Sequence, residues 1–211
     1  MRSFVRVLIL GMAVAAAALA QQWEIGGLGG GSFLTSSTVK GANGSATAGF
    51  QPGPGFGAFA GNFGDRFGGE VRYLYLDNGL KLSGGGSQAT FSGVAHAIHY
   101  DFIVHPKHRE DGLVPYLAAG AGVKIFRGTG KEQAYQPLDQ FAYLTKTQQA
   151  VPLISAGGGV RYSIGRRALL RAELRDYLTP FPNKVVAPAP GAKIGGWLHN
   201  IVPMVGVSFA F

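Results

Sequence analysis

Nine charged or titratable residues lie on the more polar face of short segments in which apolar and polar positions alternate. Residues two apart on a strand share a face, and residues side by side on neighbouring strands can pair. Such charges must neutralise one another if they are buried together, whereas in a pore they would select solutes. We expect a salt-bridged network rather than a solute path. The residues are Glu70, Arg72, His99, Asp101, Lys124, Arg161, Arg171, Glu173 and Arg175.

Catalysis is a second chemistry to weigh, because His99 and Asp101 could form an oriented imidazole. A hydrolase also needs a nucleophile within hydrogen-bond reach of such a base. Ser92 lies on the opposite face from His99. It shares a face with His96, but that residue is four positions away along a strand that rises about 3.3 Å per residue. We therefore expect polar lining and no catalytic site.

Metal and cofactor sites are not expected either. The chain has no cysteine, and its histidines fall on different faces. The glycine-rich run 26–31 is not followed by a helix-forming segment, which a phosphate-binding loop requires. These glycines more simply relieve crowding inside a strongly curved sheet. The histidines concerned are His96, His99, His105, His108 and His199.

Period-2 alternation places these residues on predicted strands. In the clearest segment, Tyr100 and Phe102 share one face, and His99 and Asp101 share the other. His96 departs from this pattern because it falls on the apolar face, and we place it near the outer interface of the membrane. Eight strands are predicted, at about 22–31, 55–63, 67–76, 89–104, 114–126, 151–164, 168–178 and 197–211.

The connections between the predicted strands alternate between long and short. The long loops are 32–53, 77–88, 127–149 and 179–196, and the short turns are 64–66, 105–112 and 165–167. Antiparallel strands joined in this way form a meander, and an even number of them can close without a free edge. A soluble barrel with its apolar face inside is the rival, but the aromatic side chains are too bulky for an eight-stranded interior. We predict an all-β fold, an eight-stranded antiparallel up-and-down transmembrane β-barrel.

The first 20 residues have the features of a secretory signal peptide. Arg2 and Arg6 precede an apolar run that ends in Ala18-Leu19-Ala20. We therefore expect residues 1–20 to be removed and residues 21–211 to form one barrel domain. The formal net charge is +8, but the basic residues are scattered and not interleaved with aromatic ones. Lipopolysaccharide or another anionic envelope component is therefore a better expected partner than nucleic acid.

The C-terminal segment ends on an aromatic residue, with apolar residues two, four and six positions earlier. Together with the segments 114–122 and 170–173, it resembles the small eight-stranded outer-membrane β-barrel superfamily, the group of the OmpA transmembrane domain, OmpX and Opa-like proteins. The resemblance covers residues 21–211 and implies long extracellular loops, short periplasmic turns and recognition by the barrel assembly machinery. The implied assembly signal is Val205, Val207, Phe209 and Phe211.

The function that these features predict is non-enzymatic. We expect a monomeric protein of the cell outer membrane whose long loops serve adhesion or envelope integrity. A small passive channel lined by the interior charges is the alternative, and a barrel enzyme that modifies lipid A is a lesser one. No cofactor is expected.

Overall fold

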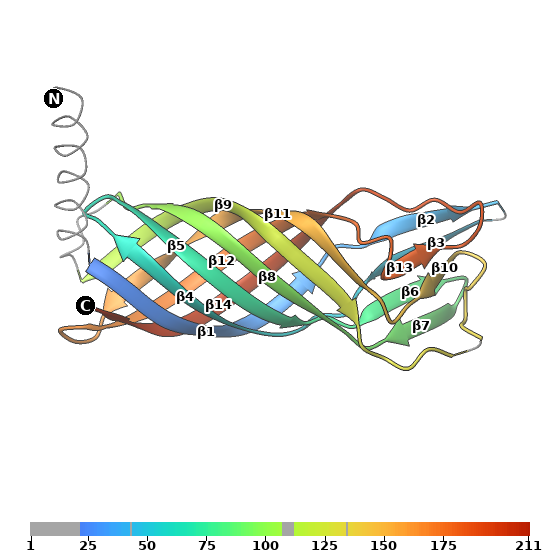
Figure 1. Cartoon of the computed structure of the whole chain (residues 1–211), viewed down its shortest axis with the longest axis horizontal. Coiled ribbons are helices and arrows are strands. Elements are labelled where there is room, and N and C mark those ends of the chain that lie inside the picture. The colour runs from blue at the N-terminus through green and yellow to red at the C-terminus, as the bar shows by residue number, and fades with distance from the viewer. Residues whose placement is uncertain (1–21, 43, 107–111, 134) are drawn as a thin grey trace, which may run out of the picture.

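Eight long antiparallel strands close into a barrel in the computed structural model, and β1 meets β14 (Figure 1). This confirms the predicted all-β up-and-down barrel. The structure describes residues 22–42, 44–106, 112–133 and 135–211, so the expected signal peptide lies outside the described residues. In order around the barrel the strands are β1 (Gln22–Leu34), β4 (Gly53–Phe63), β5 (Phe67–Asp77), β8 (Gly93–Val104), β9 (Leu113–Gly128), β11 (Gln148–Ser163), β12 (Ala168–Pro180) and β14 (Trp197–Ala210).

The strands are tilted because the pairing register is staggered. Successive hydrogen-bonded partners traced from Glu24 around the ring return to β1 at Leu34, ten residues further on (from 24 to 34). Such a stagger fixes the tilt and width of an eight-stranded barrel and leaves an interior that side chains can fill. At the seam, the backbone N–H of Trp23 donates to Phe211 O at 3.1 Å, and that of Phe211 donates to Trp23 O at 2.9 Å.

The two faces of the sheet divide as the alternation predicts. Phe102 is 51 % exposed on the outside, whereas its neighbour Asp101 is fully buried in the lumen. Phe209 and Val207 also face outward, and Ser208 between them is buried. Among the described residues, no helix has the length and apolarity to cross a bilayer.

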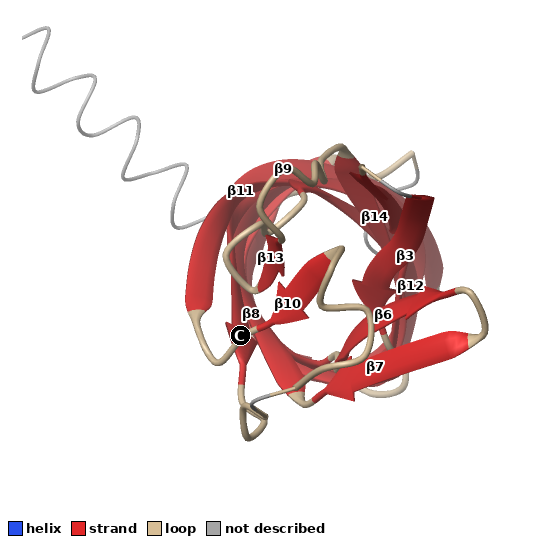
Figure 2. Cartoon of the chain, turned by 90° about the vertical axis from the view of Figure 1, so that its right-hand side faces the viewer, coloured by secondary structure: helices blue, strands red, loops and turns tan. Residues whose placement is uncertain are grey.

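The predicted long loops are in the expected places, but they are not irregular. They form a four-stranded sheet, ordered β2-β3-β6-β7, and a two-stranded sheet, β10-β13, beyond one end of the barrel (Figures 1 and 2). We call this part the cap, the described residues of 35–52, 78–92, 129–147 and 181–196. Its strands are β2 (Ser37–Gly41), β3 (Gly44–Phe50), β6 (Leu80–Gly84), β7 (Ser87–Phe91), β10 (Ala142–Leu144) and β13 (Val186–Pro188).

The predicted strand 89–104 is divided between these two parts. Residues up to Phe91 pair with β6 in the cap, and β8 of the barrel begins at Gly93. The backbone carbonyl of Ser92, between them, accepts hydrogen bonds from Thr129 N at 2.8 Å and Gly130 N at 3.1 Å. The segment therefore changes partners at Ser92, which alternation alone does not reveal.

One hydrophobic core runs from the cap into the upper half of the lumen. Phe50 of the cap packs against Phe126 of β9, with ring centroids 5.1 Å apart, and against Phe181, at 6.3 Å. Leu74 and Val202 belong to the same core lower in the barrel, and both are fully buried. The end of the lumen nearest the cap is therefore filled by apolar side chains.

Candidate functional site

The lower half of the lumen contains charged side chains from five strands, β1, β5, β8, β11 and β12. Inward-facing glycines are paired with these residues on the neighbouring strands and leave space for the charged side chains. A Cβ atom at Gly120 would lie 2.3 Å from Asp101 Oδ1, and one at Gly159 would lie 2.8 Å from Glu173 Cβ. The alternation of glycine with small residues on β9 and β11 thus lets long charged residues of β5, β8 and β12 cross the lumen.

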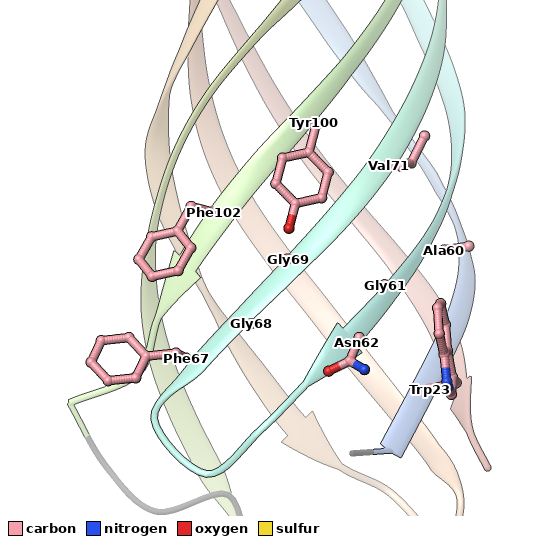
Figure 3. A pocket seen from close by; sticks show the side chains of 10 residues that line it. All are labelled: Trp23, Ala60, Gly61, Asn62, Phe67, Gly68, Gly69, Val71, Tyr100 and Phe102. Atoms are coloured by element: carbon pink, nitrogen blue, oxygen red, sulfur yellow. The ribbon is translucent and has the colours of Figure 1, made fainter. Parts of the chain in front are cut away.

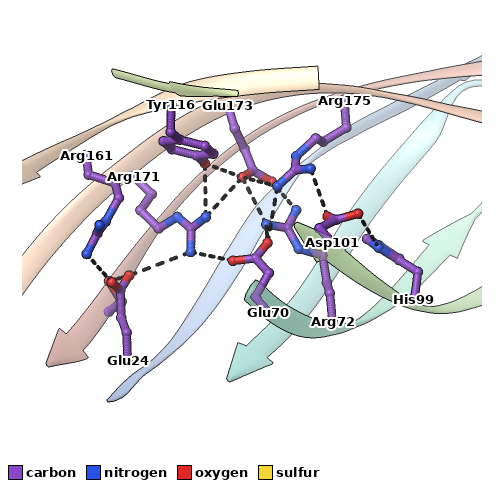
Figure 4. Close-up of polar contacts among 11 residues, drawn as sticks. Glu24, Glu70, Arg72, His99, Asp101, Tyr116, Arg161, Arg171, Glu173 and Arg175 are labelled. Atoms are coloured by element: carbon purple, nitrogen blue, oxygen red, sulfur yellow. Dashed lines mark hydrogen bonds and ion pairs between the residues drawn. The ribbon is translucent and has the colours of Figure 1, made fainter. Parts of the chain in front are cut away.

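Glu173 lies at the centre of these charges (Figure 4). Arg72 donates to both of its carboxylate oxygens, through Nη1 to Oε1 and through Nη2 to Oε2 at 3.0 Å. The Tyr116 hydroxyl donates to Oε2 at 2.6 Å. Nη2 of Arg171 and Nη2 of Arg175 each lie 3.6 Å from the same oxygen. The negative charge of the Glu173 carboxylate is thus shared among three guanidinium groups, those of Arg72, Arg171 and Arg175.

Arg171 links the centre to the end of the barrel where both described ends of the chain lie. Its Nη1 donates to Glu70 Oε2 at 3.0 Å and lies 3.6 Å from Glu24 Oε1. Its guanidinium carbon lies 4.1 Å from the ring centroid of Phe59, a cation–π contact. Glu24 in turn accepts hydrogen bonds from Arg161 Nη2.

Arg175 links the centre to the pair predicted as an oriented imidazole. Its Nη1 donates to Asp101 Oδ2 at 2.8 Å, and its Nη2 donates to Glu70 Oε1 at 3.2 Å. Asp101 Oδ1 lies 3.1 Å from His99 Nδ1. The His99–Asp101 contact is therefore present, but it is buried in the lumen as an extension of the charge network.

The network is balanced in charge. It joins four carboxylates to four guanidinium groups, and none of the eight residues is more than 6 % exposed. Buried charges are tolerated when each is paired and hydrogen-bonded. We refer to these residues as the charge network: Glu24, Glu70, Asp101, Glu173, Arg72, Arg161, Arg171 and Arg175.

Lys124 does not join the charge network, although the sequence places it on the same face. It is fully buried, and its Nζ lies 4.8 Å from the ring centroid of Phe126. Among the described residues, no hydrogen-bond partner lies within reach of Nζ. Lys124 is four residues beyond Gly120, the partner of Asp101, so it lies nearer the cap.

Sequence reasoning missed Glu24 and the role of Tyr116. Glu24 is the single charge on β1 and is followed by glycines, so no second charge two positions away marks its face. Glu24 lies between Trp23 and Ile25, and both of these residues are exposed on the outside of the barrel. Because side chains alternate along a strand, two outward neighbours indicate that Glu24 faces inward. Tyr116 has the same parity as Lys124 on β9, which places it on the inward face, but alternation does not reveal that its hydroxyl bonds to Glu173.

Two further histidines lie on the outer wall. His96 faces outward near the cap, as expected, with Nδ1 2.8 Å from the Tyr73 hydroxyl. His199 Nδ1 lies 2.7 Å from Asp176 Oδ2 on the outside of the barrel. The backbone N–H of His199 donates a hydrogen bond to Thr35 Oγ1 at 3.0 Å.

The chain is similar to several solved structures. Neisserial surface protein A has 14 % identity and a TM-score of 0.52, with 90 % of this chain and 97 % of that chain covered. The N-terminal barrel of Pseudomonas aeruginosa OprF has 17 % identity and a TM-score of 0.44, with coverages of 90 % and 97 %. Ail of Yersinia pestis, solved with a heparin analogue, has 12 % identity and a TM-score of 0.39, with coverages of 90 % and 99 %.

The first of these three similarities supports the eight-stranded barrel fold. No curated protein matches the chain in sequence. The model of the outer membrane protein beta-barrel domain matches residues 6–209, almost the whole length of the chain. The protein therefore belongs to the family of outer-membrane β-barrel domains.

Proposed function

We propose that this protein is a non-enzymatic outer-membrane barrel whose cap makes contacts at the cell surface, in adhesion or in envelope integrity. The observation that supports this proposal is the folded cap, which shares one hydrophobic core with the lumen. Binding functions commonly lie on loops held by a rigid scaffold. With the lumen filled, the outside of the cap is the surface through which the protein meets partners beyond the membrane.

The charge of the cap favours an anionic partner. It carries six lysines against one glutamate and one aspartate. A net positive surface attracts anionic ligands and accelerates their association. Lipopolysaccharide is the partner that best fits a cap at the outer surface. The charged residues of the cap are Lys40, Lys81, Lys131, Glu132, Asp139, Lys146, Lys184 and Lys193.

A passive channel is the alternative that the interior charges first suggested. Arg72 and Glu173 bond to each other across the lumen, and Phe126 packs against Phe50 above them. A solute would therefore have to displace a paired charge cluster and then an apolar layer. The geometry favours a structural role for the charge network.

Binding to lipopolysaccharide by the barrel in lipid nanodiscs tests the proposal, because the nanodisc shields the wall of the barrel. Changing the six cap lysines to glutamine should weaken binding about tenfold at low ionic strength, and less in salt, since exposed charges are screened. A control that removes half as many positive charges changes three exposed arginines at the opposite end to glutamine, Arg66, Arg166 and Arg167. Equal binding by both variants would contradict the proposal.

A further inference from the structure

The outer wall of the barrel has a groove near the end opposite the cap (Figure 3). It has a volume of about 410 Å³ and crosses β1, β4, β5 and β8. Backbone of Gly68 and Gly69 forms its floor, as Figure 3 shows, with aromatic side chains on both sides. Pockets of about 300–1,000 Å³ are the size that binds small ligands.

Gly69 explains why the wall is hollow at this point. It occupies an outward-facing position between the inward-facing Gly68 and Glu70, and its partners on the neighbouring strands are Phe102 of β8 and Asn62 of β4. A Cβ atom at Gly69 would lie 1.9 Å from the Tyr100 hydroxyl oxygen. The Tyr100 ring therefore lies against β5 across the space that a side chain would occupy. Ala60 on β4, the outward-facing partner of Val71, is small, so the floor stays wide.

The two sides of the groove are aromatic and exposed. Trp23 forms one side (Figure 3). Phe67 and Phe102 stand on the other, with their rings stacked at a centroid distance of 5.8 Å. These three residues and Tyr100 are all at least half exposed. Aromatic side chains with this exposure are typical of the membrane–water interface.

The position of the groove identifies the chemistry of its ligand. The groove is continuous with the outward-facing apolar wall, which contacts lipid in this family. It lies beside the short turn 64–66, and short turns of such barrels are periplasmic. Arg66 is exposed in that turn and directly precedes Phe67, so it is the cation nearest in sequence to this side of the groove. An acyl chain would meet the glycine floor and aromatic sides, and a phosphate would meet the turn.

We propose that this groove is a binding site for a single phospholipid of the periplasmic leaflet. One acyl chain lies over Gly68 and Gly69 between Trp23 and Phe67, and the phosphate lies towards Arg66. The site does not depend on the cap or on its partner, so the failure of one proposal leaves the other standing.

Native mass spectrometry of the detergent-refolded barrel, with phosphatidylglycerol added, tests the site. The expected result is one retained phospholipid under conditions that strip weakly held lipids. Gly69→Leu fills the floor, and Phe67→Ala removes one side; each should lower the retained fraction about fivefold, as expected for losing part of an apolar contact. Phe67→Ala keeps the test decisive if Gly69→Leu does not fold, because Phe67 points away from the barrel.

The matched control is Gly27→Leu on β1. Gly27 also faces outward, and a Cβ atom there would meet nothing nearer than 3.8 Å, so a leucine fits. Retention should be unchanged in this variant. Arg66→Gln should weaken retention of phosphatidylglycerol without affecting folding. Equal retention by all variants, or displacement of phospholipid by lipopolysaccharide, would overturn the proposal.

Discussion

Glu173 is the residue on which the charge network most depends, because it contacts Arg72, Tyr116 and two further arginines. Glu173→Gln should lower the free energy of unfolding by about 3–5 kcal/mol, because buried guanidinium groups lose their compensating charge. Urea titration of the refolded barrel in detergent would measure this. Tyr116→Phe is the milder control and should cost about 1–3 kcal/mol, because the hydroxyl makes two hydrogen bonds: it donates to Glu173 Oε2 and accepts from Arg171 Nη2.

A double-mutant cycle separates this effect from simple loss of packing. Arg72→Met removes the cation that bonds both oxygens of Glu173. The double variant Arg72→Met/Glu173→Gln should lose less free energy of unfolding than the sum of the losses in the two single variants. The expected difference is about 0.5–3 kcal/mol. Strictly additive costs would show that the two residues act independently, against the network described here.

Most of the network residues could be predicted from alternation, because a period of two assigns each side chain to a face. Which inward residues meet across the lumen could not, because that depends on the stagger between strands. Lys124 shares the inward face with Asp101, yet it lies in a different layer of the lumen. Glu24 was missed because one charge on a strand creates no pattern.

At the scale of elements, β7 is an edge strand, because in the described part of the cap it pairs only with β6. The turn of the β6-β7 hairpin contains only Gly85 and Gly86, so the flanking pair Gly84–Ser87 is a hydrogen-bonded pair. Along the hairpin from there, non-hydrogen-bonded and hydrogen-bonded pairs alternate. The backbone of Ala89 therefore bonds to β6, whereas that of Thr90 points to the free edge. The opposite edge of this sheet is covered at Lys40, which bonds to Lys193 by two hydrogen bonds of 2.9 Å.

This alternation predicts unequal effects of proline in β7. Thr90→Pro should leave the cap folded, because no bond to β6 is lost, whereas Ala89→Pro should open the hairpin. Limited trypsin digestion at Lys81 would report the difference, with faster cleavage in Ala89→Pro alone. Rapid cleavage of both variants would show that the register of the hairpin is different.

The closing strand β14 allows the assembly signal to be tested separately from the fold. Phe211 contributes two backbone hydrogen bonds to the seam, while its side chain is exposed. Phe211→Ala keeps the backbone bonds and should refold in detergent with the normal heat-dependent shift on SDS gels. In cells, its level in the outer membrane should fall severalfold, because the aromatic recognition group is missing. An unchanged cellular level would remove Phe211 from the signal.

The sequence was a good guide to the elements of the barrel and a poor one to those of the cap. Barrel strands are long and place aromatic residues such as Tyr100 and Phe102 on the lipid side, so their alternation is strong. The strands of the cap are short and rich in Gly, Ser and Thr, which is also the composition of irregular loops. Their pairing depends on contacts between distant segments, such as β3 with β6.

At the scale of the whole molecule, the lumen is closed at two levels, and we therefore expect no ion conduction. In planar bilayers the refolded barrel should give no steady single-channel steps. Phe126→Ala removes one aromatic side chain from the apolar layer and leaves the charge network unchanged. This variant should therefore also show no conductance, because the charge network fills the lumen below the apolar layer. Regular conductance steps from the unaltered chain would restore the channel alternative.

The hydrogen bonds between Trp23 and Phe211 join the first described strand to the last residue of the chain. The ring of strands consequently cannot be completed until β14 is available to pair with β1. Until then, β1 and the most recently added strand both present unpaired edges, which favour aggregation. Contacts between such distant residues also form slowly. We therefore expect the unclosed barrel to be the form of this chain that aggregates most readily during refolding.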